Sequence, residues 1–224
     1  MMIEMNGNNQ DNQNNGLNKD ENEKNINIET SSGEQSSKCG KLLVISGPSG
    51  VGKTEVALNL RAYSPIYVKA ITSTTRKKRD GETHGVDYYF VTLEEFEKMK
   101  ADGNLLEWTV YNGNCYGTPK HSVEKALSCG KIVILVIDVA GALNIKKMFP
   151  EAVMCFLNAE SLDAIERRLR RRGTDSEEAI KGRLSVAQSE INSKEKFDFE
   201  IMNREGKIES AVFELHQTIQ KLMG

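Results

Sequence analysis

The sequence contains few cysteines for its length, and their spacing argues against two common uses of this residue. The 224 residues include four cysteines: Cys39, Cys115, Cys129 and Cys155. No two of them form a Cys-x-x-Cys pair, so their positions predict neither a zinc site nor a dithiol redox centre. This usage is typical of a reduced, intracellular protein, and we expect a cytoplasmic location.

Long apolar runs and a strong net charge are also missing. The longest apolar run, Ile132 to Ile137, is far too short to cross a bilayer. The polar N-terminus lacks the apolar segment of a signal peptide. The formal net charge is −2, which gives no electrostatic reason to bind nucleic acid. We therefore expect neither a membrane nor nucleic acid among the partners.

Residues 1–38 have too few apolar side chains to form a core. Asparagine dominates this stretch, with Gln, Glu, Ser and Lys between. Such a composition cannot bury enough surface to offset the entropy lost on ordering, so we predict a disordered tail. A recognition segment and a targeting sequence are the alternatives. The remaining residues are enough for about one domain of ordinary size.

The most informative stretch is Leu42–Thr54, where a short apolar run leads into a glycine-rich loop. The loop reads Gly47-x4-Gly52-Lys53-Thr54, which is the pattern of a phosphate-binding loop. Its glycines let backbone N–H groups point at phosphate oxygens, Lys53 adds positive charge, and the Thr54 hydroxyl can bind Mg²⁺. The helical pattern that follows directs its N-terminus at the same anion. The sequence therefore predicts that a nucleoside triphosphate is bound by Ser49, Gly50, Val51, Gly52, Lys53 and Thr54.

Strands and helices alternate along the rest of the chain. Near-continuous apolar runs at 131–138 and 152–157 are typical of parallel strands buried on both faces. Because helical patterns separate these runs, we predict an α/β fold with a parallel-sheet core flanked by helices. The segment 72–118 looks antiparallel and interrupts the alternation as a small mixed α+β insertion. Within it we expect Thr72–Arg79 to be a polar, basic loop.

A phosphate-binding loop occurs in switches, motors and small-molecule kinases, and the other motifs favour a kinase. The Asn-Lys-x-Asp motif that a GTP-driven switch would need is missing. Arg76 and Arg79 indicate a second anion pocket, because each guanidinium can make two bonds to a phosphate. Tyr88 and Tyr116 can add hydroxyl donors. Each of the four could alone be a surface arginine or a core tyrosine, but together in one insertion they indicate a phosphorylated acceptor.

The sequence resembles the guanylate kinase family over nearly all of residues 41–222. Four blocks and a lid segment carry the resemblance: Gly47–Thr54; Thr72–Arg79 with Asp87-Tyr88; Glu107-Trp108 with Gly113–Thr118; Ile137–Gly141; and Arg172–Thr174 with Arg183-Leu184. The resemblance implies reversible, Mg²⁺-dependent transfer of the ATP γ-phosphoryl group to GMP, and also to dGMP. It implies a core at 39–71, 119–160 and 194–224, a GMP-binding insertion at 72–118 and a helical lid at 161–193. We expect a monomer.

The resemblance also implies roles for individual residues. Lys53, Arg79, Arg172 and Arg183 are implied to be catalytic, and Asn203 to lie near the adenine. Asp138 is implied to lie near the acceptor and the metal. The residues implied to hold GMP are Arg76, Arg79, Tyr88 and Tyr116 on the phosphate, Thr72, Glu107 and Thr118 on the guanine, and Asp138.

Glu107 is the residue predicted to recognise the guanine base. Guanine presents N1–H and N2–H₂ side by side, so one carboxylate can accept from both. Adenine has an acceptor at N1 and no amino group at C2. The loss of such charged hydrogen bonds costs about 1.5–3 kcal/mol each. The alternative is that Glu107 pairs with a nearby arginine and only holds the insertion together.

The helix predicted after Ser161 is crowded with arginines, namely Arg167, Arg168, Arg170, Arg171 and Arg172. They cannot all face one ligand on a helical wheel, so we assign one or two to catalysis and the others to solvent. A nucleic-acid patch is the alternative. After Gly173, Thr174 or Asp175 is predicted to cap the next helix.

Four positions depart from the family pattern: Glu55, Lys78, Val136 and Ala140. Glu55 puts negative charge near the α-phosphate, and Val136 removes a carboxylate near the metal. None of the four removes a phosphate ligand, so we expect them to affect catalytic efficiency rather than the family to which the sequence is assigned. Two alternatives remain, a phosphopeptide-binding domain of the same fold and a nucleoside monophosphate kinase of another specificity. The intact phosphate loop favours a kinase.

Overall fold

The computed structural model describes residues 40–111, 113–173 and 175–223. The tail predicted at 1–38 lies outside these ranges. The larger of two sheets has five strands in the order β2-β7-β1-β8-β9, and every pairing within it is parallel. The strands are β1 (Lys41–Ser46), β2 (Tyr67–Lys69), β7 (Ile132–Val136), β8 (Val153–Asn158) and β9 (Phe199–Met202). This confirms the predicted parallel-sheet core.

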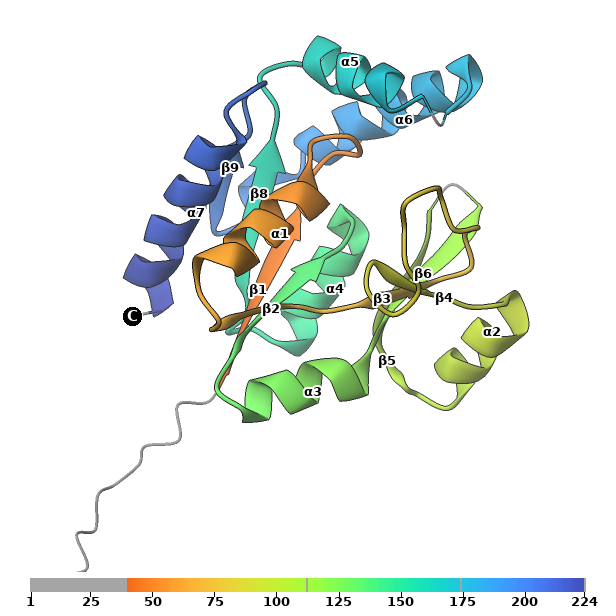
Figure 1. Cartoon of the computed structure of the whole chain (residues 1–224), viewed down its shortest axis with the longest axis vertical. Coiled ribbons are helices and arrows are strands. Elements are labelled where there is room, and N and C mark those ends of the chain that lie inside the picture. Colours follow the sequence, from red (N-terminus) through yellow and green to blue (C-terminus); the bar gives the residue numbers. More distant parts are fainter. Residues whose placement is uncertain (1–39, 112, 174, 224) are drawn as a thin grey trace, which may run out of the picture. The chain divides into compact units, whose positions relative to one another are not determined.

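Helices cover both faces of this sheet, as Figure 1 shows. Along β1, Leu43 and Ile45 pack with α1 (Lys53–Tyr63) and α7 (Ile208–Met223). The alternate residues Leu42 and Val44 pack on the other side with α3 (Lys120–Ser128) and α4 (Val139–Met148). Because both faces are buried, the strand reads as one continuous apolar run in the sequence.

A second, four-stranded sheet has the order β4-β3-β6-β5 and forms the insertion. Its elements are β3 (Thr72–Thr74), β4 (Tyr88–Phe90), α2 (Leu93–Ala101), β5 (Leu105–Tyr111) and β6 (Asn114–Pro119). The sheet is mixed, because β3 pairs parallel with β4 but antiparallel with β6. The prediction of a loop over Thr72–Arg79 is therefore wrong for its first three residues, whose β-branched and hydroxyl side chains pack in this sheet.

Two consecutive helices, α5 (Leu162–Arg172) and α6 (Glu177–Ile191), follow β8. Ser161 caps α5 as predicted, through a hydrogen bond from the N–H of Ala164. The cap of α6 is Ser176, which accepts from the N–H of Ala179. The predicted cap at Asp175 is therefore wrong, because this carboxylate pairs with Arg183 instead. Thr174 lies outside the described residues.

A short 3-10 helix at Lys194–Lys196 connects α6 to β9. In the ranges that the structure covers, no helix combines the length and hydropathy needed to cross a membrane.

Candidate active site

The phosphate loop connects β1 to α1, and its backbone needs glycine where it passes β8. Gly47 has a φ of 135°. A Cβ atom at this position would lie 2.0 Å from the carbonyl oxygen of Leu157, which no larger residue could tolerate. The ammonium group of the half-buried Lys53 side chain donates to the carbonyl oxygens of Gly47 at 2.5 Å and Pro48 at 3.0 Å. The Lys53 side chain is thus held against the loop in which it is predicted to bind phosphate.

Two carboxylates lie near Lys53. Burial lowers the pKa of Lys53, while the negative charges of Glu190 on α6 and Asp138 oppose this shift. Asp138 also accepts from the N–H of Gly141 at 2.7 Å and thereby caps α4. Burial raises the pKa of Glu190. The phosphate loop therefore faces a mixed environment of one ammonium group and two carboxylates.

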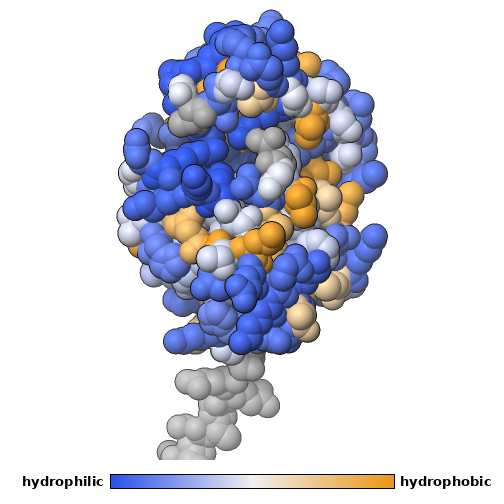
Figure 2. All heavy atoms as spheres, turned by 90° about the vertical axis from the view of Figure 1, so that its right-hand side faces the viewer, coloured by the Kyte–Doolittle hydropathy of each residue, from blue (hydrophilic) through white to orange (hydrophobic). Residues whose placement is uncertain are grey.

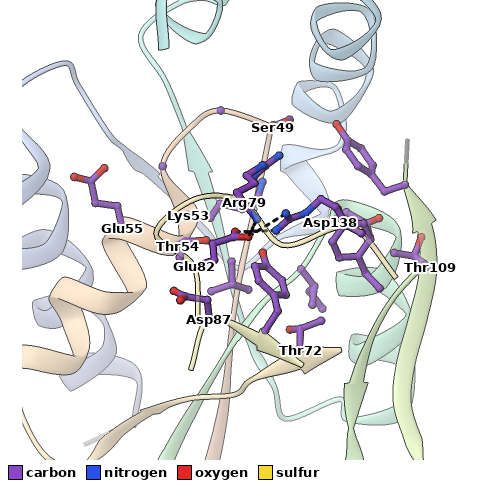
Figure 3. A pocket seen from close by; sticks show the side chains of 18 of the residues that line it. Ser49, Lys53, Thr54, Glu55, Thr72, Arg79, Glu82, Asp87, Thr109 and Asp138 are labelled. Atoms are coloured by element: carbon purple, nitrogen blue, oxygen red, sulfur yellow. Dashed lines mark hydrogen bonds and ion pairs between the residues drawn. The ribbon is translucent and has the colours of Figure 1, made fainter. Parts of the chain in front are cut away.

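A cavity of about 420 Å³ joins the phosphate loop to the insertion. Figure 3 shows that side chains from the loop, such as Ser49 and Lys53, and from the insertion, such as Thr72 and Thr109, surround the same space. On the side shown in Figure 2 the surface is mostly hydrophilic, with a hydrophobic band across it. The cavity is lined by these predicted residues: Ser49, Gly50, Gly52, Lys53, Thr54, Thr72, Arg76, Arg79, Tyr88, Glu107, Tyr116, Asp138, Arg172 and Arg183.

Basic and aromatic side chains of the insertion lie together in one part of the cavity wall. The Arg76 guanidinium makes two hydrogen bonds to the Glu82 carboxylate, at 3.0 and 2.8 Å, and lies 5.3 Å from the centre of the Tyr88 ring. Glu82 also accepts from the backbone N–H of Arg79 at 2.8 Å. The rings of Tyr88 and Tyr116 meet edge to face. Glu82 therefore fixes the orientation of Arg76 and the backbone of Arg79 within the wall of this pocket.

Glu107 on β5 is only 5% exposed. Its Oε1 accepts from the Thr118 hydroxyl at 2.7 Å, whereas Oε2 is buried and has no hydrogen-bond donor among the described residues. Burial raises the pKa of Glu107 to about 7. Glu107 has no arginine partner in the part of the chain that the structure covers, so the alternative of a structural ion pair finds no support.

The helices α5 and α6 bring Arg172 and Arg183 to the wall of the cavity. Arg183 forms an ion pair with Asp175 at 3.1 Å, in which both side chains are nearly buried. It also lies 3.5 Å from the Ser49 hydroxyl of the phosphate loop. The α6 helix therefore contacts the tip of the phosphate loop directly.

A second cavity, of about 490 Å³, lies beside the phosphate loop and is lined by Asn203 and Arg168. The Asn203 amide donates to the carbonyl oxygen of Val51 at 2.8 Å. The Arg168 guanidinium donates to the carbonyl oxygens of Val51 at 3.1 Å and Asn203 at 2.7 Å. Arg168 thus ties the phosphate loop to the segment that follows β9.

The other arginines of α5 divide as the helical wheel indicates. Arg168 and Arg172 are four residues apart on one face and line the cavities, and Arg171 also lines the second cavity. The other three form surface ion pairs with glutamates: Arg167 and Arg171 with Glu205, and Arg170 with Glu166 and Glu177. Of the five arginines, Arg172 lines the cavity that contains Lys53, and the assignment of one or two of them to catalysis stays a prediction.

Several lining residues were missed by sequence reasoning. Glu82, Thr109, Tyr111 and Glu190 all line the first cavity. Thr109 and Tyr111 could have been found, because they alternate with Glu107 along a strand and must share its face. Three predicted residues do not line that cavity. Val51 and Asn203 are hydrogen-bonded to each other, and Thr118 donates a hydrogen bond to Glu107.

The fold and the cavity define a P-loop kinase, in which a phosphate loop faces a cluster of arginine and tyrosine side chains of the insertion across one cavity. A family model described as guanylate kinase matches residues 39–222, which is most of the chain. The chain therefore belongs to the guanylate kinase family, whose members transfer a phosphoryl group between ATP and GMP.

Individual relatives agree with this assignment. The chain is 44% identical over 180 residues to a guanylate kinase of Carboxydothermus hydrogenoformans, covering 80% of this chain and 87% of the relative. It is 45% identical over 170 residues to a guanylate kinase of Synechocystis, covering 76% and 89%. The crystal structure of guanylate kinase from Anaplasma phagocytophilum has 32% sequence identity and a TM-score of 0.67, covering 82% of this chain and 86% of that one.

Proposed function

We propose that this chain transfers the γ-phosphoryl group of MgATP to GMP or dGMP within the cavity between the phosphate loop and the insertion. The observation that carries the proposal is the Glu107 carboxylate, which is buried in the same cavity as Lys53 and has one oxygen without a donor among the residues that the structure describes. A buried acceptor of this kind is costly unless a ligand supplies donors. The N1–H and N2–H₂ groups of guanine would supply them.

The GMP phosphate would bind to Arg76, Arg79, Tyr88 and Tyr116. The two hydrogen bonds that Arg76 donates to the Glu82 carboxylate support this assignment, because they orient Arg76 before any ligand binds. On the base, Thr72 would contact guanine directly. Thr118 would act through Glu107, because its hydroxyl is already committed to that carboxylate.

In the transfer step, an oxygen of the GMP phosphate attacks the γ-phosphorus of ATP, and the bond from that phosphorus to the β–γ bridging oxygen breaks. Lys53, Arg172 and Arg183 would stabilise the negative charge on the moving group, and Arg79 would hold the acceptor phosphate. The backbone from Ser49 to Thr54 would hold the ATP phosphates, and Asn203 would lie near the adenine. This catalytic set is part of our proposal.

The residues of the phosphate site fit Mg²⁺. The described residues contain no group of three or more His, Cys, Asp or Glu side chains that could hold a metal ion by themselves. This fits a cation that keeps several waters and takes its other ligands from one protein hydroxyl and phosphate oxygens. Thr54 would provide that hydroxyl, with Asp138 nearby. When bound, Mg²⁺ would offset the charge of the β- and γ-phosphates.

We further propose that the segments 39–71, 119–160 and 194–224 act as the ATP-binding core, 72–118 as the GMP-binding insertion and 161–193 as a lid. The direct contact between α6 and the phosphate loop supports the lid assignment. We also propose that the protein acts as a monomer in the cytoplasm. The described cysteines, which are free, support a reducing compartment.

A coupled assay of ADP release tests the proposal, with GMP, dGMP, AMP, UMP and CMP as acceptors. We expect GMP and dGMP to be used, the other three to react at least about a hundredfold more slowly, and EDTA to stop the reaction. Equal turnover of AMP and GMP would overturn the base assignment. A lack of ADP release with every acceptor would favour a binding domain. Size-exclusion chromatography with light scattering tests the monomer.

A further inference from the structure

Tyr111 carries an unexplained hydroxyl group in the wall of the cavity. It is the last residue of β5, and its side chain lines the cavity together with Glu107 and Thr109. The hydroxyl oxygen is buried and forms no hydrogen bond of regular geometry within the described ranges, although the Ser49 hydroxyl of the phosphate loop lies close to it. A buried O–H group without an acceptor is unfavourable, so it requires a functional explanation.

The strand itself explains where this hydroxyl lies. Residues 107, 109 and 111 alternate on one face of β5, while Trp108 and Val110 on the opposite face are exposed. Four residues of extended strand span about 13 Å. This is close to the reach of a nucleotide from its base to the phosphoryl group beyond its own phosphate. When Glu107 holds the guanine, Tyr111 is therefore at the phosphoryl end.

The neighbours of Tyr111 belong to the phosphate site. Its pKa is raised, first by burial, and its surroundings include the Ser49 hydroxyl and the charges of Glu190, Arg183 and Asp138. Arg183 itself reaches Ser49. The hydroxyl therefore stays protonated at physiological pH and can only act as a donor toward an anion.

We propose that Tyr111 is a catalytic residue that donates a hydrogen bond to an oxygen of the phosphoryl group in transit from ATP to GMP. The tyrosine keeps its proton throughout. One P–O bond forms to the GMP phosphate oxygen, one breaks to the β–γ bridging oxygen, and ADP leaves. This inference rests on the proposed function, because it needs the acceptor to lie between Glu107 and the phosphate loop.

The test compares Tyr111→Phe with the wild type. This change removes one oxygen and keeps the ring, so the thermal unfolding midpoint should stay within a few degrees. We expect kcat to fall about tenfold to a hundredfold, as for the loss of a hydrogen bond to a charged group. The dissociation constant for GMP should change less than about twofold. Tyr89→Phe is the matched control, because Tyr89 lies in the insertion but does not line the cavity.

A second readout separates a catalytic role from a structural one. The complex of enzyme, ADP, GMP and aluminium fluoride mimics the phosphoryl group in transit. We expect Tyr111→Phe to weaken fluoride-dependent assembly of this complex by a factor similar to the loss in kcat. Binding of GMP without fluoride should be unchanged.

Three results would overturn the inference: an unchanged kcat, a loss confined to GMP affinity, or an equal loss in Tyr89→Phe. If the wild-type protein itself fails to phosphorylate GMP, the proposed function fails instead. If the wild type is active and Tyr111→Phe is equally active, only the role of Tyr111 is lost.

Discussion

The Thr118 hydroxyl donates a 2.7 Å hydrogen bond to Oε1 of Glu107 and leaves Oε2 of the same carboxylate without a donor among the described residues. The two residues are eleven positions apart and lie on neighbouring strands, β5 and β6. One oxygen is therefore used to orient the carboxylate, and the other is available to a ligand. This division of the two oxygens leads to the first two predictions.

Replacing Glu107 by Gln should reduce the preference for GMP. The amide puts an NH₂ donor where guanine also presents donors, so kcat/KM for GMP should fall about thirtyfold to a thousandfold, or roughly 2–4 kcal/mol. The side chain keeps its size, and KM for ATP should barely change. The measurement is kcat/KM with GMP and with AMP. Glu94→Gln on the surface of α2 is the control, and an unchanged ratio of GMP to AMP would show that Glu107 is structural.

The pH dependence of GMP binding should follow Glu107. Because burial raises its pKa to about 7, the ionised form that accepts from guanine is lost as the pH falls below that value. The dissociation constant for GMP should therefore rise about tenfold per pH unit below 7, and Glu107→Gln should keep only the part that comes from the GMP phosphate, whose second pKa is about 6. Isothermal titration between pH 5 and 8 measures it. A flat profile in the wild type would contradict the assignment.

The same carboxyl group should make the free protein less stable as the pH rises. Its pKa is about 7 in the folded state and about 4.5 in the unfolded state, so the folded state binds the extra proton between these values. The free energy of unfolding should then fall as the pH rises from 4.5 to 7, by up to about 3 kcal/mol. Urea unfolding of wild type and Glu107→Gln across this window measures the difference. Parallel curves would mean that Glu107 titrates normally.

Lys53→Met should abolish phosphoryl transfer and leave the fold intact. The methionine side chain fills a similar volume but carries no charge for the β- and γ-phosphates. Because partial burial already lowers the pKa of Lys53, removing this charge should change the unfolding midpoint by only a few degrees. The measurement is steady-state turnover beside a thermal melt, with exposed Lys125→Met on α3 as control. Retention of more than about a tenth of the wild-type turnover would contradict the mechanism.

Arg168→Lys should weaken ATP binding without affecting GMP. A lysine keeps the charge but cannot donate to the carbonyl oxygens of both Val51 and Asn203 in the fixed geometry of a guanidinium. We expect KM for ATP to rise about tenfold and the unfolding midpoint to fall by a few degrees. Arg167→Lys is the matched control on the same helix, because its side chain is 57% exposed and lines neither cavity. Equal effects of both substitutions would show that Arg168 acts only through its charge.

Local patterns were enough to predict the phosphate loop, the buried parallel strands and the amphipathic helices. The loop depends on glycines and a lysine that are adjacent in the chain, and Thr92 and Glu95 form the capping box that starts α2. Such features arise from interactions over a few residues, so the sequence states them directly. The resemblance to a family added the roles of residues that are far apart, but not their contacts.

Only the tertiary structure decided which side chains meet across the cavity. Arg168 and Val51 are 117 positions apart, and nothing in the helix that carries Arg168 identifies a loop carbonyl as its partner. The contact of Thr118 with Glu107 depends on the register of β5 and β6, which shifts between Leu105 and Trp108. A shift of one residue turns every side chain to the opposite face of a strand. The positions of Glu107, Thr109 and Tyr111 on one wall were therefore set by strand pairing, which the sequence encodes only through the packing of the whole insertion.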